Sequence, residues 1–459
     1  PRLDLRGRLR ERGVAGGVER GEYILRYSRA SHPGHNTRMP LRIALISHSP
    51  GGGGAERALA RLASALDPKL WQQLVVVPAP GPLADELRAQ DLDVRVLPIA
   101  WWIPATHWPP EHFFAQYDGL EERVARLVTL LADERVDLVH SNTVVTLEGA
   151  LAAAQLGLPH IWHSRGQFDD RFPPPYFEVD LAFIFSALDL LSDALLCVSK
   201  AVAEQAHDYC REVPVEIVPE ALDLDDLVRR STTVSRSTLL ERLHLPSDAR
   251  IVACLGGLQR RKGQLDLVLA AVRIAARYPK AFFVLAGAAN DTEYVETLRS
   301  SLAELGLATR FRLPGHLDTP PLLAHCDLIV HPSHSEGFSL SILEALALGR
   351  PVVATRCGGS DEVIEEWRTG LLVPPRQPEA IAAAIEAVLS GRLAFDPDRA
   401  RERTRIYGPA ASAAAIGASL LRAHRHHADS RPEASRRASA RSFVASLGAR
   451  FRHLRALLC

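Results

Sequence analysis

The sequence predicts an α/β protein made of two domains, each with a parallel β-sheet. Short apolar segments alternate with helical patterns along most of the chain, and this alternation is typical of parallel sheets with right-handed crossovers. A polar stretch over residues 223–250 divides the alternation into two series. The 459 residues are also too many for one ordinary domain. We therefore expect two Rossmann-like domains that face each other across a cleft.

The expected elements follow from the period of the apolar residues. The strands of the first series are expected at residues 43–47, 74–77, 94–97, 138–140, 160–163, 194–198 and 215–218. Those of the second series are expected at residues 251–255, 282–286, 310–313, 328–331, 352–354 and 371–373. Helices are expected at residues 56–66, 120–132, 265–277, 292–305, 379–389 and 410–425. Ligands of such sheets bind at the carboxyl ends of the strands.

The domain boundaries are expected where the composition changes. We expect an N-terminal domain over residues 39–220, a C-terminal domain over residues 221–409, and a helix over residues 410–428 that packs back on one of them. Met39 is the only methionine and directly precedes the first expected strand. Residues 1–38 are therefore expected to be a disordered extension that precedes the natural start. Residues 429–459 form a basic tail.

Composition excludes several classes of protein. No apolar run approaches the ~20 residues of a membrane-spanning helix. The six cysteines are scattered without a C-x-x-C pair, which indicates reduced core residues of a cytoplasmic protein. Residues 1–38 and residues 429–459 each carry an excess of five positive charges. The body of the chain, residues 39–428, therefore has a net charge of −10. An acidic body argues against a nucleic-acid-binding protein.

The basic tail has two interpretations. Residues 435–458 place arginines and apolar residues at helical spacing, which predicts a basic amphipathic helix on the inner face of an anionic membrane. The alternative is a solvated or loosely packed tail, because a Ser/Arg/Ala stretch precedes it.

The most informative motif is HSEGFSLSILEALALGRPVVA, residues 334–354. Glu336 and Glu344 stand eight positions apart, around a small polar turn that runs into a helix expected from Ser341 to Gly349. A helix start binds anions through its free N–H groups, and carboxylates hold hydroxyls, so the pattern suits a sugar diphosphate. For Glu344 the alternative is a capping box with Ser341, in which it only satisfies its own helix.

A cationic loop follows the first strand of the second series. It reads LGGLQRRKG over residues 255–263 and contains Arg260, Arg261 and Lys262. Three adjacent cations at a strand end are suited to a phosphate. The alternative is a solvated charge run.

The first series carries weaker signals. Gly51, Gly52, Gly53 and Gly54 at a strand-to-helix turn can close around an anion or a sugar, although a plain tight turn is the alternative. The pattern matches neither a nucleoside triphosphatase loop nor a dinucleotide fingerprint. His163 at a strand end can hydrogen-bond a hydroxyl, or it can be a structural histidine.

The sequence holds two further groups of residues that carry weaker signals. Trp101, Trp102 and Trp108 occupy a proline-rich loop and suit a sugar, a lipid or a partner, with core packing as the default. Asp223 and Asp225 form a D-x-D pair in the interdomain stretch, where a metal site is not expected.

Taken together, these motifs resemble the family 4 glycosyltransferases, which have the GT-B fold. The resemblance covers most of residues 39–425. It rests on the glycine loop, VDLVHSN at residues 136–142, ALLCVS at 194–199, RRKG at 260–263, the E-x7-E pair, GGSDE at 358–362 and GLLVP at 370–374. It implies metal-independent transfer of a sugar, with retention, from a nucleotide-diphosphate sugar to an acceptor hydroxyl of a saccharide or a lipid-linked glycan.

The resemblance also implies roles for individual residues. The catalytic group is Glu336, which would hold sugar hydroxyls, with Arg261 and Lys262 on the diphosphate and His163 near the donor sugar. Glu344 would hold the ribose, and the remaining donor-binding residues are Gly257, Gly337, Phe338, Ser339 and Leu340. Gly52, Gly53, Gly54 and Asn142 are expected in the cleft near the acceptor.

The chain departs from the family pattern in two places. Gly257 stands where members commonly have arginine, so Arg260 or Arg261 would substitute, and residues 219–223 read PEALD where Asn-Gly is usual. The rival interpretations are a nucleotide-sugar epimerase-like enzyme on the same scaffold and a non-catalytic sugar- or lipid-binding protein. Neither is favoured by the presence of Glu336, Glu344 and Lys262 together.

Overall fold

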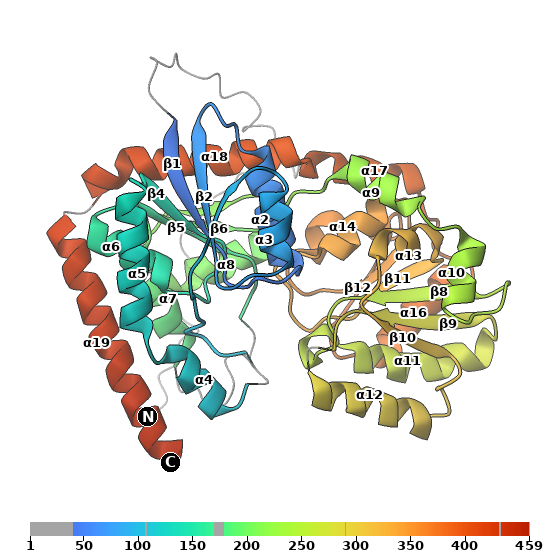
Figure 1. Cartoon of the computed structure of the whole chain (residues 1–459). Helices are drawn as coiled ribbons and strands as arrows, with labels where there is room; N and C mark the ends of the chain where they lie inside the picture. The colour runs from blue at the N-terminus through green and yellow to red at the C-terminus, as the bar shows by residue number, and fades with distance from the viewer. Residues whose placement is uncertain (1–39, 106–107, 169–178, 290, 431–432, 459) are drawn as a thin grey trace, which may run out of the picture. The chain divides into compact units, whose positions relative to one another are not determined.

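The computed structural model describes residues 40–459 apart from 106–107, 169–178, 290, 431–432 and 459. The expected extension over residues 1–38 lies outside this part of the chain. Two parallel sheets organise the described residues (Figure 1).

The first sheet has seven strands in the order β3-β2-β1-β4-β5-β6-β7. Every neighbouring pair is parallel. Its strands are β1 (Leu41–Ile46), β2 (Trp71–Val77), β3 (Asp93–Val96), β4 (Leu138–Ser141), β5 (His160–Ser164), β6 (Ala194–Cys197) and β7 (Val215–Ile217). Strand order reverses between β1 and β4, which makes the loops after these strands the expected ligand-binding edge.

The second sheet has six parallel strands in the order β10-β9-β8-β11-β12-β13. They are β8 (Arg250–Leu255), β9 (Ala281–Ala286), β10 (Phe311–Gly315), β11 (Leu328–His331), β12 (Val352–Thr355) and β13 (Gly370–Val373). We call the part of the chain that carries the first sheet the first half, and the part that carries the second sheet the second half. The first six strands of each half have the same order, and in the second half the order reverses between β8 and β11. This confirms the prediction of two Rossmann-like domains.

Helices cover both faces of each sheet. In the first half they are α2 (Gly54–Ala65), α3 (Pro82–Arg88), α4 (Pro110–Tyr117), α5 (Leu120–Asp133), α6 (Glu148–Leu156), α7 (Leu181–Leu191) and α8 (Lys200–Tyr209). In the second half they are α9 (Leu224–Ser231), α10 (Arg236–Arg242), α11 (Gln264–Arg277), α12 (Thr292–Glu304), α13 (Thr319–His325), α14 (Leu340–Ala347), α15 (Ser360–Val363), α16 (Pro378–Leu389) and α17 (Pro397–Thr404), with short 3-10 turns at Arg260–Lys262 and Arg405–Tyr407.

The central strands are buried on both faces. Ile43, Leu45 and Ile46 of β1 are fully buried, as are Ile251 and Val252 of β8. Strands covered on both faces carry unbroken apolar runs, which is why each expected strand matches an observed one within a few residues.

The polar stretch between the two series is helical. Its helices α9 and α10 bury Leu227, Leu239 and Leu240 in one core cluster with Ile251 of the second sheet. The stretch therefore belongs to the second half, and its polar residues form the exposed faces of two short helices.

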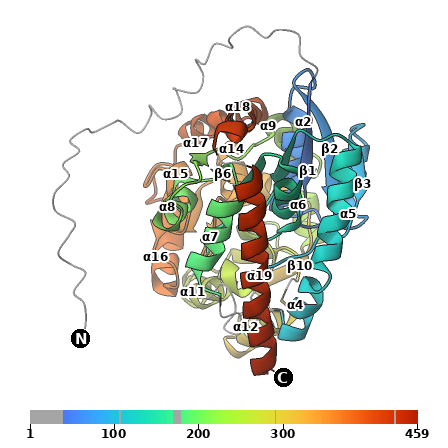
Figure 2. The same ribbon diagram turned by 90° about the vertical axis from the view of Figure 1, so that its left-hand side faces the viewer.

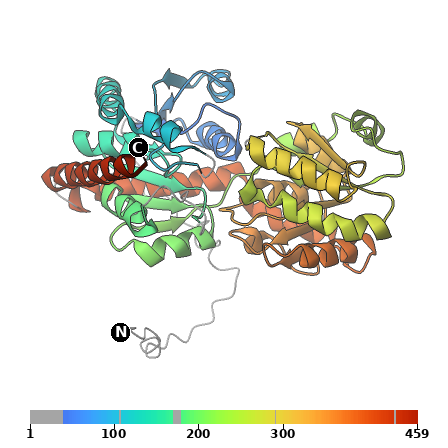
Figure 3. The ribbon, with the colours of Figure 1, turned by 90° about the horizontal axis from the view of Figure 1, so that it is seen from below.

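The last two helices pack on the first half. α18 (Pro409–Ser430) buries Ile416 and Leu420 in the cluster that includes Leu59 of α2. α19 (Glu433–Leu458) lies against α6 and α7 (Figures 2 and 3).

The packing of α19 corrects both interpretations of the basic tail. The helix was predicted, but its apolar face is neither free for a membrane nor solvated. Phe443 is buried edge-on against Trp102, and Phe451 against Phe113, with 5.8 and 5.1 Å between ring centroids. None of the described helices combines the length and the apolar character needed to cross a membrane.

Candidate active site

The candidate site lies where strand order reverses in the second sheet. The loop after β8 carries the turn Arg260–Lys262, and the loop after β11 carries residues 332–339. A backbone hydrogen bond joins the two loops: the His334 N–H donates to the carbonyl of Arg261 at 2.8 Å. A side chain at Gly263, where φ is +64°, would collide with the carbonyl of Pro332. The two loops thus require this glycine in order to meet.

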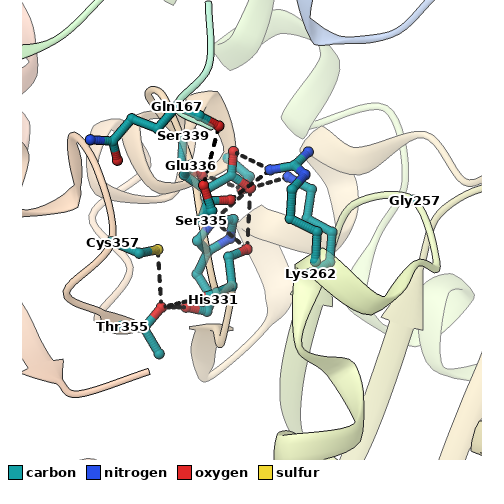
Figure 4. A network of polar contacts seen from close by, with 12 residues as sticks. Gln167, Gly257, Lys262, His331, Ser335, Glu336, Ser339, Thr355 and Cys357 are labelled. Atoms are coloured by element: carbon teal, nitrogen blue, oxygen red, sulfur yellow. Dashed lines mark hydrogen bonds and ion pairs between the residues drawn. The ribbon is translucent and has the colours of Figure 1, made fainter. Parts of the chain in front are cut away.

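Glu336 is the centre of a buried polar network (Figure 4). Its carboxylate forms an ion pair with the Lys262 ammonium and lies 3.4 Å from the Arg261 guanidinium. The Ser333 hydroxyl donates to it at 3.1 Å. Burial opposes ionisation, but Lys262 and Arg261 hold the pKa of Glu336 well below its ordinary value. The sequence-predicted carboxylate and cations therefore meet in one cluster.

Only two of the three loop cations point to this cluster. Arg261 also donates to the Ser335 carbonyl at 2.6 Å, whereas Arg260 turns away to Glu293 at 2.9 Å. Of the two candidates to replace the family's arginine, Arg261 is the one at the site. Gly257 belongs to the same loop, before the turn, and its carbonyl accepts a hydrogen bond from the Gln264 side chain.

The turn after Glu336 leads into α14 one residue before the predicted start. Ser339 is the N-cap, its hydroxyl accepting from the N–H of Ile342 at 3.4 Å, so the helix starts at Leu340 rather than near Ser341. Within the described chain, no acceptor binds the N–H groups of residues 337–340. Free N–H groups at the start of a helix, together with the helix dipole, are suited to an anion.

Gly337 lies close to protein backbone. A side chain there would collide with the carbonyl of Arg165 from the first half. The ring of Phe338 packs against Tyr407 at 5.3 Å, so Phe338 offers only its backbone to the turn.

Glu344 is not part of a capping box, which corrects that alternative. It lies in the interior of α14, and its carboxylate is 3.6 Å from the Arg61 guanidinium of α2. Burial raises the pKa of Glu344, although Arg57 and Arg61 favour its ionised form. The Glu344 carboxylate is thus a buried group beside cations of α2, and it does not cap its own helix.

The glycine loop lies at the reversal point of the first sheet. Gly52 and Gly54 face open space, and Gly53 packs close to the Glu56 carboxylate. The Trp101 indole donates to the carbonyl of His48 at 3.1 Å, so the tryptophan loop borders the glycine loop. Trp102, in contrast, is a core residue.

Asn142 is placed behind this loop and is fully buried. Its amide donates to the Ala55 carbonyl at 2.8 Å, and its side-chain oxygen accepts from Arg165 at 2.8 and 3.0 Å. Both ends of the amide are therefore used within the protein. Asn142 thus positions the start of α2 through its bond to Ala55, and its place near the acceptor stays a prediction.

Arg165 is the residue that the sequence interpretation missed. Its guanidinium donates to the side-chain oxygen of Asn142 at 2.8 Å, to the Glu220 carboxylate at 2.6 Å and to Nδ1 of His163 at 3.2 Å. The signal was its place two residues after His163 at the end of β5, but the partner Asn142 is 23 positions away and cannot be found from local spacing.

Arg165 also fixes the tautomer of His163. Burial first, and then the charge of Arg165, hold the pKa of His163 well below its ordinary value, so the ring is neutral. A guanidinium only donates, so Nδ1 is the acceptor and the proton is on Nε2. Nε2 is buried and has no partner within the described chain. It is a donor suited to a ligand oxygen.

Asp223 has a local function. Its carboxylate caps α9 by accepting from the N–H of Asp226 at 2.9 Å. This accounts for the first carboxylate of the D-x-D pair.

The comparisons with known proteins match both halves. Residues 52–226 match Glycosyltransferase Family 4, and residues 235–409 match Glycosyl transferases group 1. The chain is 32% identical over 294 residues to the alpha-maltose-1-phosphate synthase of Mycolicibacterium smegmatis, covering 59% of this chain and 72% of that protein. The chain belongs to the family 4 glycosyltransferases.

Two other relatives are matched over a shorter part. The D-inositol 3-phosphate glycosyltransferase of Geodermatophilus obscurus is 34% identical over 44% of this chain and 46% of its own length. The GDP-mannose-dependent alpha-(1-6)-phosphatidylinositol monomannoside mannosyltransferase of Mycobacterium tuberculosis is 33% identical over 40% of this chain and 48% of its own. The chain thus spans about half the length of these two relatives.

The fold is similar to that of HepE from Anabaena, solved in complex with UDP. That structure has a TM-score of 0.67 and 23% identity, and covers 83% of this chain and 100% of its own. The likeness agrees with the GT-B fold.

Proposed function

We propose that the protein transfers a sugar, with retention of anomeric configuration, from a nucleoside-diphosphate sugar to an acceptor hydroxyl. The observation that carries this proposal is the cluster of Glu336, Lys262 and Arg261 at the reversal point of the second sheet, next to the free N–H groups that begin α14. Cations, free amides and a carboxylate together suit a diphosphate that carries a hydroxylated sugar.

Each donor residue has a proposed role. Lys262 and Arg261 neutralise the diphosphate and stabilise it as it leaves. Glu336 accepts from sugar hydroxyls, Glu344 accepts from the ribose hydroxyls, and the N–H groups of residues 337–340 cover the phosphates. The Nε2–H of His163 donates to a sugar oxygen.

The reaction needs no protein base at Glu336. Because its two cations hold the pKa of Glu336 well below the ordinary value, this carboxylate is a poor proton acceptor. The bond between the anomeric carbon and the diphosphate oxygen breaks, and a bond from the same carbon to the acceptor oxygen forms. The acceptor proton passes to the departing diphosphate. Arg261 and Lys262 supply the positive charge that a metal supplies in other folds.

The acceptor is proposed to bind at the first half. Gly52 and Gly54 leave backbone open beside Trp101, whose face can stack on a sugar ring. The names of the relatives include acceptors such as phosphatidylinositol monomannoside, which supports a glycolipid or polysaccharide product. The five described cysteines are free and buried, which supports a reducing, cytoplasmic location.

A donor panel tests the proposal. UDP-glucose and GDP-mannose are suitable first donors, because the names of HepE and of the mannosyltransferase contain UDP and GDP-mannose. The full-length protein is incubated with each donor and with saccharide or lipid acceptors, and the anomer of the product is read by NMR. We expect a retained anomer and unchanged turnover in EDTA. An inverted product or metal-dependent turnover would contradict the proposed mechanism, and release of an epimerised sugar would favour the epimerase alternative.

A further inference from the structure

A cavity lies on the first half, between α19 and the helices α4, α5 and α6. Its volume is about 1000 Å³, at the upper end of the roughly 300–1,000 Å³ of ligand pockets. Buried apolar side chains of Phe114, Leu120, Val124 and Leu151 contribute to its lining. None of the residues proposed for sugar transfer lines it.

A stripe of arginines from α19 forms the other wall of this groove. Arg437, Arg441, Arg452 and Arg455 line it and recur three, four or eleven positions apart, which places them on one face of the helix. Ala445 and Gly448 occupy the same face between the two pairs. Because alanine has only a methyl group and glycine has no side chain, no long side chain fills the middle of the groove at these two positions.

The charges along the groove are only partly compensated. Asp118 and Glu121 also line it, and Arg455 pairs with Asp118 at 2.9 Å. Among the described residues, neither Arg441 nor Arg452 has a carboxylate within ion-pair distance. The groove therefore has an excess of positive charge along an apolar floor.

We propose that this groove binds an anionic lipid, with one hydrocarbon chain on the apolar floor and the phosphate at Arg441 and Arg452. Guanidinium groups bind phosphate oxygens bidentately, and a chain of methylene groups is buried favourably against Phe114 and Val124. The proposal does not depend on the sugar-transfer reaction.

The position of α19 supports a lipid over other occupants. The apolar face of this helix is already used, since Phe443 and Leu447 are buried in the core of the first half. What remains for a membrane is the arginine stripe and the groove beside it. A lipid phosphate complements that charge, and its hydrocarbon chain covers the apolar floor. A second copy of the chain has an acidic body that would complement the charge, but it would bring no hydrocarbon chain for the floor.

Vesicle sedimentation with the full-length protein tests the proposal. The vesicles contain phosphatidylglycerol and phosphatidylcholine in one series and phosphatidylcholine alone in the other. We expect binding only to the anionic vesicles, and a loss of about tenfold or more in Arg441→Glu/Arg452→Glu. Arg425→Glu, which changes an exposed arginine of α18, is the control for charge and should bind nearly as the wild type does.

Two variants distinguish the groove from general surface attraction. Gly448→Leu and Ala445→Phe fill the groove without changing its charge. A side chain at Gly448 meets the guanidinium end of Arg452 at 3.3 Å and the Tyr117 hydroxyl at 3.8 Å, which is an ordinary contact. Both should weaken binding to anionic vesicles, by about tenfold for one displaced chain segment of two methylene groups. Ala445 is exposed, so Ala445→Phe decides the matter if Gly448→Leu does not fold.

Three results would overturn the proposal. The first is no binding of the wild type to anionic vesicles. The second is equal binding by the filling variants and the wild type, which would place the lipid outside the groove. The third is binding by Arg441→Glu/Arg452→Glu that equals that of the wild type. Light scattering is recorded on the same variants. A self-association that the filling variants abolish, without vesicle binding by the wild type, would assign the groove to a second copy and also overturn the proposal.

Discussion

Replacing Lys262 by alanine removes the closest cation from Glu336 and, on the proposed mechanism, one of two cations from the diphosphate. The Lys262 side chain is 17% exposed, so little solvent screens its charge. Losing one preorganised electrostatic contact of this kind costs about 2.7–4 kcal/mol at the transition state, which corresponds to roughly 10²–10³ in kcat. We therefore expect Lys262→Ala to lower kcat by that factor.

The fold should survive this substitution. Arg261 remains 3.4 Å from Glu336, and the Ser333 hydroxyl still donates to it, so the buried carboxylate keeps compensating partners. We expect a loss of about 1–3 kcal/mol in unfolding free energy, the range for a buried group that loses one partner. Transfer kinetics and thermal unfolding measure the two effects separately.

Arg260→Ala is the matched control. Arg260 belongs to the same turn but pairs with Glu293 and is about half exposed, so its loss should leave kcat within about threefold of the wild type. Wild-type kcat in Lys262→Ala, or equal losses in Lys262→Ala and Arg260→Ala, would refute the assignment of Lys262 to the diphosphate.

The other predictions concern the two glutamates and the buried histidines. Glu336→Gln should lower kcat/KM about 100-fold because a neutral amide holds the sugar hydroxyls less strongly; unchanged steady-state kinetics would contradict its role. Glu344→Gln should raise the donor KM about tenfold with a smaller change in kcat, as loss of a ribose contact requires; a purely catalytic loss would argue against ribose binding. Burial lowers the pKa of His140 to about 3 and of His160 to about 4. The unfolded chain takes up these protons below pH ~6.5 while the folded chain does not, so stability should fall as pH drops from 6.5 to 4, by up to about 1.4 kcal/mol per unit for each histidine. Denaturant unfolding of His140→Gln against the wild type measures this slope, which should be smaller in the variant.

The sheets could be predicted because their signal is local. Runs such as residues 328–331 are apolar and β-branched, and burial on both faces of a parallel sheet requires that composition. The start of α14 was predicted to within one residue. The capping residue could not be chosen, because Ser339 and Ser341 are equally good caps by type and only the backbone decides between them.

Long-range partners could not be predicted. The amphipathic pattern of α19 indicated an apolar face, but nothing in residues 435–458 identifies Trp102 and Phe113 as what covers it. In the same way, the motif around His163 did not reveal that Arg165 fixes its tautomer and holds Asn142. Chemistry at a strand end is readable from the sequence, whereas the groups that orient it come from other elements.

A crystal structure of the protein with a nucleoside diphosphate tests the central claim most directly. The account predicts diphosphate oxygens within hydrogen-bond distance of the Lys262 ammonium, the Arg261 guanidinium and the N–H groups that begin α14. A diphosphate bound instead at the glycine loop of the first half, with Lys262 and Glu336 still paired and no ligand beside them, would contradict it.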